Sequence, residues 1–449
     1  MKNKKIIFIL LTFLFTVILQ GCKKEWLEIR SSKGLVIPST LSDAEAILNR
    51  TTIMNEGRTS PLGDIAAGDF IVPSSYWRSL VPWQANAYLW KEELFVDNIG
   101  LENWGNFYQQ IYYANLILEI LNKIDKIDDQ KKYNNVKGRA LFFRSWAYYQ
   151  LAQIYCLPYS EQNIGKPGLP LRDGTDLDVK LIRSTIGQTY LQMKNDVSES
   201  IQLLDETSIN MYQPNRRAAL MLLSRVNLIM ADYKSALHNS DEAIKLNGEL
   251  LNYNDLDLTK AYPFPDGNVE VVFYTSISYA QVMSAVRIDI SPELLKEYSD
   301  NDLRKKGFFV LKNGLTNFKG PYTGPNGYFG GLATDELYLI RSECYLRSGD
   351  LDKSRADLNF LLSKRYKDFQ PIADLSSDEL LSRILLERRK ELLLRGVAWT
   401  DLKRLNLHKN TERTVTKIVE GETYSLEPNS LRYAMPFPQV VVDLGSYAQ

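Results

Sequence analysis

The feature of the sequence that most constrains the fold is a helix-turn-helix pattern that occurs twice. Residues 218–247 read as two amphipathic helices with a turn near Ala231–Tyr233, and residues 335–365 repeat the pattern with a turn at Gly349–Leu351. When the two turns are aligned, the apolar positions coincide: Leu222 with Ile340, Val226 with Cys344, and Ile244 with Leu362. Such a helix pair buries its apolar face only by stacking on a neighbour. The chain is therefore expected to contain stacked helices.

The two pairs have the pattern of tetratricopeptide repeats, and further helices accompany them. Residues 104–121, 135–155 and 184–204 carry apolar side chains at three- and four-residue steps, which is the spacing of one helix face. Together these segments predict a mainly α fold, with helical scaffolds over about 101–250 and 333–405. A long insertion separates the two pairs, which excludes a simple tandem array.

Two stretches break the helical pattern, at about 50–100 and 250–332. The second is rich in Pro, Gly, Tyr and Phe; within it, residues 269–275 read as a short strand and residues 320–331 as irregular structure. Residues 320–331 are not a phosphate loop, because no Gly-Lys-Ser/Thr follows and no strand leads in. Loops on a rigid scaffold often carry binding residues, so these two stretches are the expected places for function.

The first residues of the chain predict export and lipid attachment. Three lysines precede an apolar run at 6–19, which is the pattern of a signal peptide and is shorter than the roughly 20 residues of a transmembrane helix. The run leads into Leu-Gln-Gly-Cys, which resembles the lipobox of bacterial lipoproteins. In a lipobox the thiolate of the cysteine, here Cys22, is the nucleophile that takes up a diacylglycerol. We therefore expect a signal peptide at 1–21, lipid attachment at Cys22 and a tether at 22–30.

Composition argues against several classes of function. Lysine plus arginine equals aspartate plus glutamate, at 54 each, so no strong field favours nucleic acid. Besides the lipidated cysteine, Cys156 and Cys344 lie in apolar helical patterns that indicate buried thiols and no disulfide framework. The two histidines, His238 and His408, support neither a histidine-rich metal site nor a Ser-His-Asp triad. The acidic segment 252–257 lacks the spacing of a calcium loop. We expect no catalytic residue, no metal and no cofactor.

A charged helix within residues 384–404 places opposite charges three and four residues apart. Its neighbours that can pair are Glu387 with Lys390, Arg388 with Glu391, and Glu391 with Arg395. Gly396 is expected to end the helix. Taken by itself, the pattern is typical of a solvated helix face.

In its wider context this segment resembles the SusD-like (RagB/SusD) family of nutrient-binding outer-membrane lipoproteins from Bacteroidetes. The positions that match the family pattern are Glu387-Arg388, Glu391-Leu392, Gly396, Trp399, Asp401-Leu402 and Arg404. Arg395 and Ala398 depart from it, where Glu and Arg are usual, and these changes alter a structural ion-pair cluster. The resemblance covers nearly the whole chain, including the lipobox, the segments 104–115, 139–155 and 337–350, Asn359 and the late Pro436-Phe437-Pro438.

The resemblance implies a function as well as a fold. It implies one SusD-like domain over 22–449, with tetratricopeptide-type helix pairs and a loop-rich ligand-binding part, anchored in the outer membrane and facing the cell exterior. It implies a SusC-like TonB-dependent transporter as partner, to which the protein delivers a nutrient, most often an oligosaccharide. A peptide ligand is the alternative of the same uptake type. A surface hydrolase and a scaffold that binds only proteins are alternatives of other classes, and no motif points to the paired carboxylates of a glycosidase.

The candidate ligand-binding residues lie in the first irregular stretch. They are Tyr76, Trp77, Arg78, Trp83, Gln84 and Tyr88. Sugar rings stack on aromatic faces while polar side chains take the hydroxyl groups, and the spacing of these aromatics does not follow one helix face. The alternative for each aromatic residue is a position in the hydrophobic core. Trp104, Trp146 and Trp399 are expected to pack within the scaffold.

Overall fold

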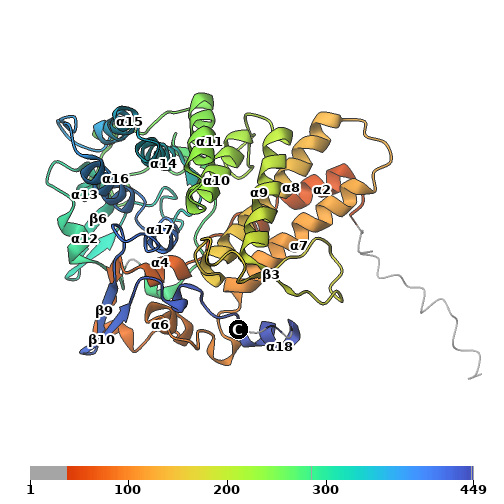
Figure 1. Ribbon diagram of the computed structural model, residues 1–449, viewed down its shortest axis with the longest axis horizontal. Coiled ribbons are helices and arrows are strands. Elements are labelled where there is room, and N and C mark those ends of the chain that lie inside the picture. The colour runs from red at the N-terminus through yellow and green to blue at the C-terminus, as the bar shows by residue number, and fades with distance from the viewer. Residues whose placement is uncertain (1–37, 285, 446, 448–449) are drawn as a thin grey trace, which may run out of the picture. The chain divides into compact units, whose positions relative to one another are not determined.

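The computed structural model describes residues 38–284, 286–445 and 447 (Figure 1). The predicted signal peptide, the lipid attachment site Cys22 and the tether at 22–30 lie outside the described residues. Residues from Thr40 onward form one compact unit. Across the described segments, none of the helices has the length and apolar character needed to span a membrane.

The first scaffold consists of long helices around a buried one. α8 (Gln130–Tyr155) packs between α7 (Glu102–Asn122) and α9 (Ile186–Leu203), and α2 (Leu41–Leu48) covers both α7 and α8. From Val136 onward nearly every side chain of α8 is buried, as expected of a helix enclosed by neighbours. Asp129 caps α8 by accepting from the Lys132 amide, and Thr185 forms a capping box with Gln188 at α9. The three predicted helices are confirmed.

The two tetratricopeptide-type pairs form as predicted and stack on each other. α10 (Arg216–Ile229) pairs with α11 (Tyr233–Leu246), and α14 (Thr334–Arg347) pairs with α15 (Leu351–Ser363). Asp232 and Asp350 cap the second helix of each pair through the amides of Ser235 and Lys353, both at 3.1 Å. α11 packs against α14, so the pairs are neighbours although the insertion separates them in sequence (Figure 1).

The insertions are more ordered than the sequence predicts. Residues 50–100 contain short helices and a strand: α3 (Thr51–Met54), α4 (Leu62–Ala67), β1 (Phe70–Ile71), α5 (Ser74–Trp77) and α6 (Pro82–Tyr88). The second insertion contains β4 (Val271–Phe273), β5 (Asp289–Ile290), α12 (Pro292–Lys296), α13 (Leu303–Phe308), β6 (Phe309–Lys312), β7 (Leu315–Phe318) and β8 (Leu332–Ala333). The short strand predicted there is confirmed as β4. The expectation of irregular structure at 50–100 is wrong, because turns of helix as short as these show no periodicity in the sequence.

The remaining strands pair antiparallel in twos. β4 pairs with β8 within the second insertion, and β5 pairs with β1, which ties the second insertion to the first. The other hairpins are β2 (Pro167–Pro170) with β3 (Arg183–Thr185), β6 with β7, and β9 (Val415–Val419) with β10 (Glu422–Leu426). Short 3₁₀ turns lie at Val96–Asn98, Tyr253–Asp255, Gln281–Met283 and Leu431–Tyr433, and the last helix is α18 (Gln439–Gly445).

The charged helix near the C-terminus is buried, which corrects the expectation of a solvated face. α16 (Ser377–Glu391) packs on α14, and α17 (Ala398–Leu405) packs on α4. Glu387 and Glu391 are fully enclosed, and Arg304 reaches both carboxylates, at 2.5 and 2.8 Å. Arg365 lies 2.6 Å from Glu391 and 2.6 Å from Glu270. A buried charge needs such partners, and they come from segments distant in sequence.

Of the three pairs predicted along this helix, one forms. Lys390 lies 3.2 Å from Glu387. Arg388 instead pairs with Glu336 and Asp401, at 3.1 and 2.7 Å. Glu391 pairs with the two arginines named above, and Arg395 pairs with Asp335 at 3.0 Å. The helix ends at Glu391, five residues before Gly396. Trp104, Trp146 and Trp399 are buried, as predicted.

Candidate functional site

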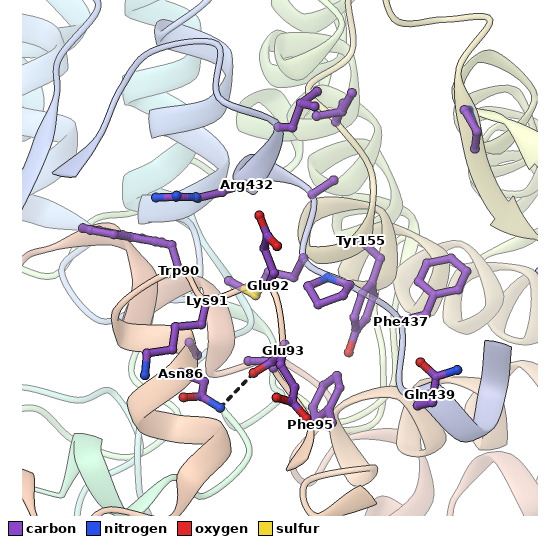
Figure 2. A pocket seen from close by; sticks show the side chains of 18 of the residues that line it. Asn86, Trp90, Lys91, Glu92, Glu93, Phe95, Tyr155, Arg432, Phe437 and Gln439 are labelled. Carbon is purple, nitrogen blue, oxygen red and sulfur yellow. Dashed lines mark hydrogen bonds between the residues drawn. The ribbon is translucent and has the colours of Figure 1, made fainter. Parts of the chain in front are cut away.

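A pocket of about 790 Å³ lies where four segments of the chain meet (Figure 2). One wall is the end of α6 with the loop after it; the others are the end of α8, the start of β2 with β3, and the segment 431–439. Its lining includes Asn86, Trp90, Lys91, Glu92, Glu93, Phe95, Tyr155, Lys166, Arg183, Arg432, Met435, Phe437 and Gln439. The pocket therefore combines aromatic and charged side chains from distant parts of the sequence.

An aromatic cluster forms one side of the pocket. The ring of Phe437 lies 5.7 Å from that of Tyr155, and Trp104 packs behind both rings at 4.5 and 5.1 Å. The Arg183 guanidinium lies over the Phe437 ring, at 4.3 Å from its centre. Figure 2 shows Tyr155 and Phe437 together on one side, facing Trp90 and Arg432 on the other. The clustered rings hold this apolar wall in place.

Trp90 is held in an uncommon backbone conformation on the opposite wall. Its φ of 55° lies in the left-handed region, which costs free energy for a residue other than glycine. The indole Nε1 donates to the carbonyl of Ala66 at 3.1 Å. In the loop that follows, the Asn86 amide donates to the Glu93 carbonyl at 2.8 Å. These contacts fix the course of the chain from α6 into the pocket wall.

A buried lysine joins the ends of two helices beneath this wall. Lys417 extends from β9, and its ammonium donates to the carbonyls of Ile65, Ala66 and Tyr88, at 2.9, 3.2 and 2.8 Å. These carbonyls belong to the last turns of α4 and α6, where helices carry partial negative charge. The ammonium also lies 3.8 Å from the Tyr88 ring centre and 4.5 Å from that of Trp90. Burial holds the pKa of Lys417 well below its ordinary value.

A second buried lysine supports the α8 wall in the same way. The Lys403 ammonium donates to the carbonyls of Gln153 and Cys156, at 2.7 and 2.5 Å. These carbonyls lie at the end of α8, beside the pocket residue Tyr155. Burial lowers the pKa of Lys403 to about 7. Both walls thus depend on a lysine that caps a helix C-terminus.

Charged side chains surround the mouth of the pocket. Lys91, Glu92, Glu93, Lys166 and Arg432 line it and are exposed. None of these five side chains forms an ion pair within the described residues. They are therefore available to hydrogen-bond a polar ligand.

The structure separates the six predicted ligand-binding residues into two groups, and none of them lines this pocket. Trp83, Gln84 and Tyr88 are buried, with 2–4% of their surface exposed. Gln84 accepts from the Val282 amide at 2.7 Å, and the Trp83 ring lies against Gly100. The expectation of exposed side chains is wrong for these three, because α6 turns them toward the core.

The other three lie at the surface. Arg78 reaches Glu420 at 2.6 Å, and both side chains are exposed. Tyr76 is half-buried beneath the Arg287 guanidinium, which lies 5.6 Å from its ring centre, and Trp77 is half-buried with its ring centre 5.7 Å from that of Tyr88. Ligand contact by Tyr76, Trp77 and Arg78 stays a prediction.

The sequence does not predict the pocket residues, although two of them lie in segments with a recognisable pattern. Trp90 lies in the aromatic-rich stretch that contains the predicted ligand-binding residues, and Phe437 lies in the Pro-Phe-Pro segment that supports the family resemblance. No local pattern places residues 86–95 beside 431–439, because only the folded chain brings them together.

One cluster of carboxylates has the spacing of metal ligands. Oxygens of Glu270, Asp335 and Glu391 lie within 4.8 Å of one another, and all three residues are buried. Each carboxylate already has a guanidinium partner: Arg365 lies 2.6 Å from both glutamates, and Arg395 lies 3.0 Å from Asp335. The positive charge that a metal would bring is thus supplied by arginines, and the cluster joins elements of the scaffold.

Comparison with known proteins shows which proteins share this fold. Residues 25–228 match the SusD-like_3 family model, described as starch-binding associating with outer membrane. Among curated proteins, none matches the chain. Solved structures of SusD-like proteins share the fold over nine-tenths of the chain, so the fold is the mainly α fold of those proteins.

Three of these structures come from Bacteroides species. A SusD superfamily protein from Bacteroides thetaiotaomicron is 23% identical, with a TM-score of 0.77, over 91% of this chain and 99% of its own. A SusD superfamily protein from Bacteroides fragilis is 23% identical, with a TM-score of 0.72, over 91% and 98%. A SusD-like carbohydrate binding protein from Bacteroides vulgatus is 20% identical, with a TM-score of 0.69, over 91% and 96%. At these identities the likeness establishes the fold. The family-model match over residues 25–228 supports the resemblance to SusD-like proteins.

Proposed function

We propose that this protein is a carbohydrate-binding SusD-like protein associated with the outer membrane. The observation that carries the proposal is the match of residues 25–228 to a family described as starch-binding. The pocket of Figure 2 supplies a place for the ligand, with a volume of about 790 Å³, within the range typical of small-molecule sites. An oligosaccharide would lie along the Tyr155 and Phe437 wall, with its hydroxyl groups against the polar mouth.

Two amides supply neutral hydrogen-bonding groups for sugar hydroxyls. Asn86 and Gln439 line the pocket on different walls, and each amide nitrogen already donates within the protein, at 2.8 and 2.7 Å. Their side-chain oxygens are left to accept from a ligand. A double variant, Asn86→Ala with Gln439→Ala, removes these groups without touching the aromatic wall.

A titration of the full-length protein with maltoheptaose and a panel of other oligosaccharides tests the proposal. We expect saturable binding, and at least a tenfold loss of affinity, about 1.4 kcal/mol, in the double variant. Gln370→Ala is the matched control, because Gln370 is an exposed amide outside the pocket. If the double variant bound every oligosaccharide of the panel with full affinity, the sugar would bind elsewhere. The surface formed by residues 76–78 would then be the next candidate.

The charged mouth favours a peptide as the second candidate ligand. Lys91, Lys166 and Arg432 suit a carboxylate, and Glu92 and Glu93 suit an amine. Under this alternative, mixed tripeptides bind and neutral oligosaccharides do not. The same titration therefore separates the two ligand classes.

The proposed activity is binding without catalysis. Glu92 and Glu93 are the carboxylates that line the pocket, and they are adjacent in sequence on one loop. A glycosidase instead places its two carboxylates on opposite sides of the scissile bond. Incubation of the full-length protein with each bound oligosaccharide, followed by chromatography, should return the sugar intact; the release of shorter products would contradict this.

The proposed setting is the outer surface of the outer membrane. It rests on the predicted lipobox at Cys22 and on the family description, and we propose one SusD-like domain over 22–449. A SusC-like TonB-dependent transporter is the proposed partner that receives the nutrient. In cells, Cys22→Ser should prevent incorporation of labelled palmitate and release the protein from the outer-membrane fraction. Affinity purification of the wild-type protein should recover the transporter.

A further inference from the structure

A second cavity, of about 260 Å³, lies between α16 and α17 and shares no lining residue with the pocket of Figure 2. Aliphatic side chains of both helices line it, among them Leu385, Leu386, Leu402 and Leu405. Three arginines and two aspartates lie among them: Arg388, Arg389, Arg413, Asp69 and Asp401. The cavity is therefore apolar over much of its wall, and at its charged part the arginines outnumber the aspartates by one.

The first source of positive charge is a buried chain of ion pairs that reaches the cavity at Arg388. In this chain four guanidinium groups share three carboxylates, in the order Arg225, Glu336, Arg388, Asp401, Arg404, Glu343 and Arg347. One positive charge is thus left without a carboxylate. The Nη1 atom of Arg388 is buried and has no hydrogen-bond partner within the described residues. A buried donor without a partner costs free energy, which a ligand acceptor would recover.

The second source is a pair of arginines that lie near one aspartate, Asp69. Arg389 lies 2.7 Å from Asp69. Arg413 pairs with no carboxylate in the part of the chain that the structure describes, and its guanidinium donates to the Ala67 carbonyl at 3.4 Å. Burial and the nearby charge of Arg389 lower the pKa of Arg413. The two arginines thus carry one more positive charge than Asp69 offsets.

We propose that this cavity binds a small carboxylate with an aliphatic body. The carboxylate would lie among Arg388, Arg389 and Arg413, since guanidinium groups form strong, charge-assisted hydrogen bonds with carboxylates. The body would lie against the leucines, where its burial adds to the affinity. Inorganic phosphate would gain only the charged contacts. This site is independent of the proposed sugar-binding pocket.

Titration of the full-length protein with ¹³C-carboxyl-labelled 4-methylpentanoate, followed by NMR, tests the proposal. We expect saturable binding, with the uncharged 4-methylpentanamide and inorganic phosphate each binding at least tenfold more weakly. The amide tests the charge at constant shape, and phosphate tests the aliphatic wall. Absence of saturable binding by the acid, or equal binding by the amide, would overturn the proposal.

Two variants locate the ligand by different means. Arg413→Leu removes one charge and should weaken binding of the acid at least tenfold, whereas Arg50→Leu, at an exposed arginine outside the cavity, should leave it unchanged. Leu386→Trp fills the cavity, keeps all three arginines and should abolish binding. Melting curves establish which variants are folded. Wild-type affinity in either folded variant would show that the acid does not bind in this cavity.

Discussion

Replacement of Glu391 by Gln distinguishes the exposed helix-surface pair that the sequence predicts from the buried ion pairs that the structure shows. In the sequence, Glu391 is one member of a helix-surface pair with Arg395, an interaction that contributes about 0.2–0.5 kcal/mol. In the structure it is buried between Arg304 and Arg365, at 2.8 and 2.6 Å. The substitution keeps the size of the side chain and removes its charge.

The buried position of Glu391 predicts a much larger loss in the free energy of unfolding. Removal of one partner from a buried ion pair costs about 3–5 kcal/mol, because the remaining charge stays desolvated. Here two guanidinium groups would lose a carboxylate, although each keeps another: Arg304 keeps Glu387 and Asp302, and Arg365 keeps Glu270. The Gln oxygen still accepts one hydrogen bond. We therefore expect a loss near the lower end, about 3 kcal/mol of the free energy of unfolding.

Urea denaturation of the full-length protein and the variant measures this difference, with equal slopes required for the comparison. Glu206→Gln is the matched control, because Glu206 is exposed and lies 3.7 Å from Arg216. This control should lower the free energy of unfolding by less than about 1 kcal/mol, as is usual for surface ion pairs. If Glu391→Gln lowered the free energy of unfolding by no more than this control, the reasoning about the buried network would be refuted.

Three further predictions follow from other parts of the structure. Trp399→Ala should lower the free energy of unfolding by about 3–5 kcal/mol, because Trp399 is buried against Tyr433; an unchanged melting temperature would contradict its packing. Lys403 has a folded-state pKa of about 7 against an ordinary 10.5, so between these values the folded state binds fewer protons and stability should rise with pH; Lys403→Met should remove this part of the pH dependence in denaturation curves. Trp83→Ala should lower the melting temperature, whereas Trp77→Ala, at a half-buried ring, should lower it less; equal losses would mean that both rings are core residues.

The sequence by itself determined the helical scaffold. Helix periodicity repeats every three to four residues, so a short window of sequence reports it, and the helices α7, α8 and α9 and the two tetratricopeptide-type pairs appear where the apolar spacing places them. The capping residues Asp232 and Asp350 likewise act within three residues of themselves. The packing role of Trp104, Trp146 and Trp399 followed from helix faces and from the family pattern.

The tertiary structure decided the site and the electrostatics. The pocket joins residues 86–95 to 431–439, and Lys417 lies about 350 residues from the carbonyls of Ile65 and Ala66 that it caps. The partners of Glu391 come from α13 and from the segment just after α15 rather than from its own helix. Trp83 and Tyr88 face inward because α6, with only seven residues, is too short for its buried face to show in the sequence. Contacts of this kind depend on which elements pack together in the folded chain, and a local pattern of residue types does not predict that packing.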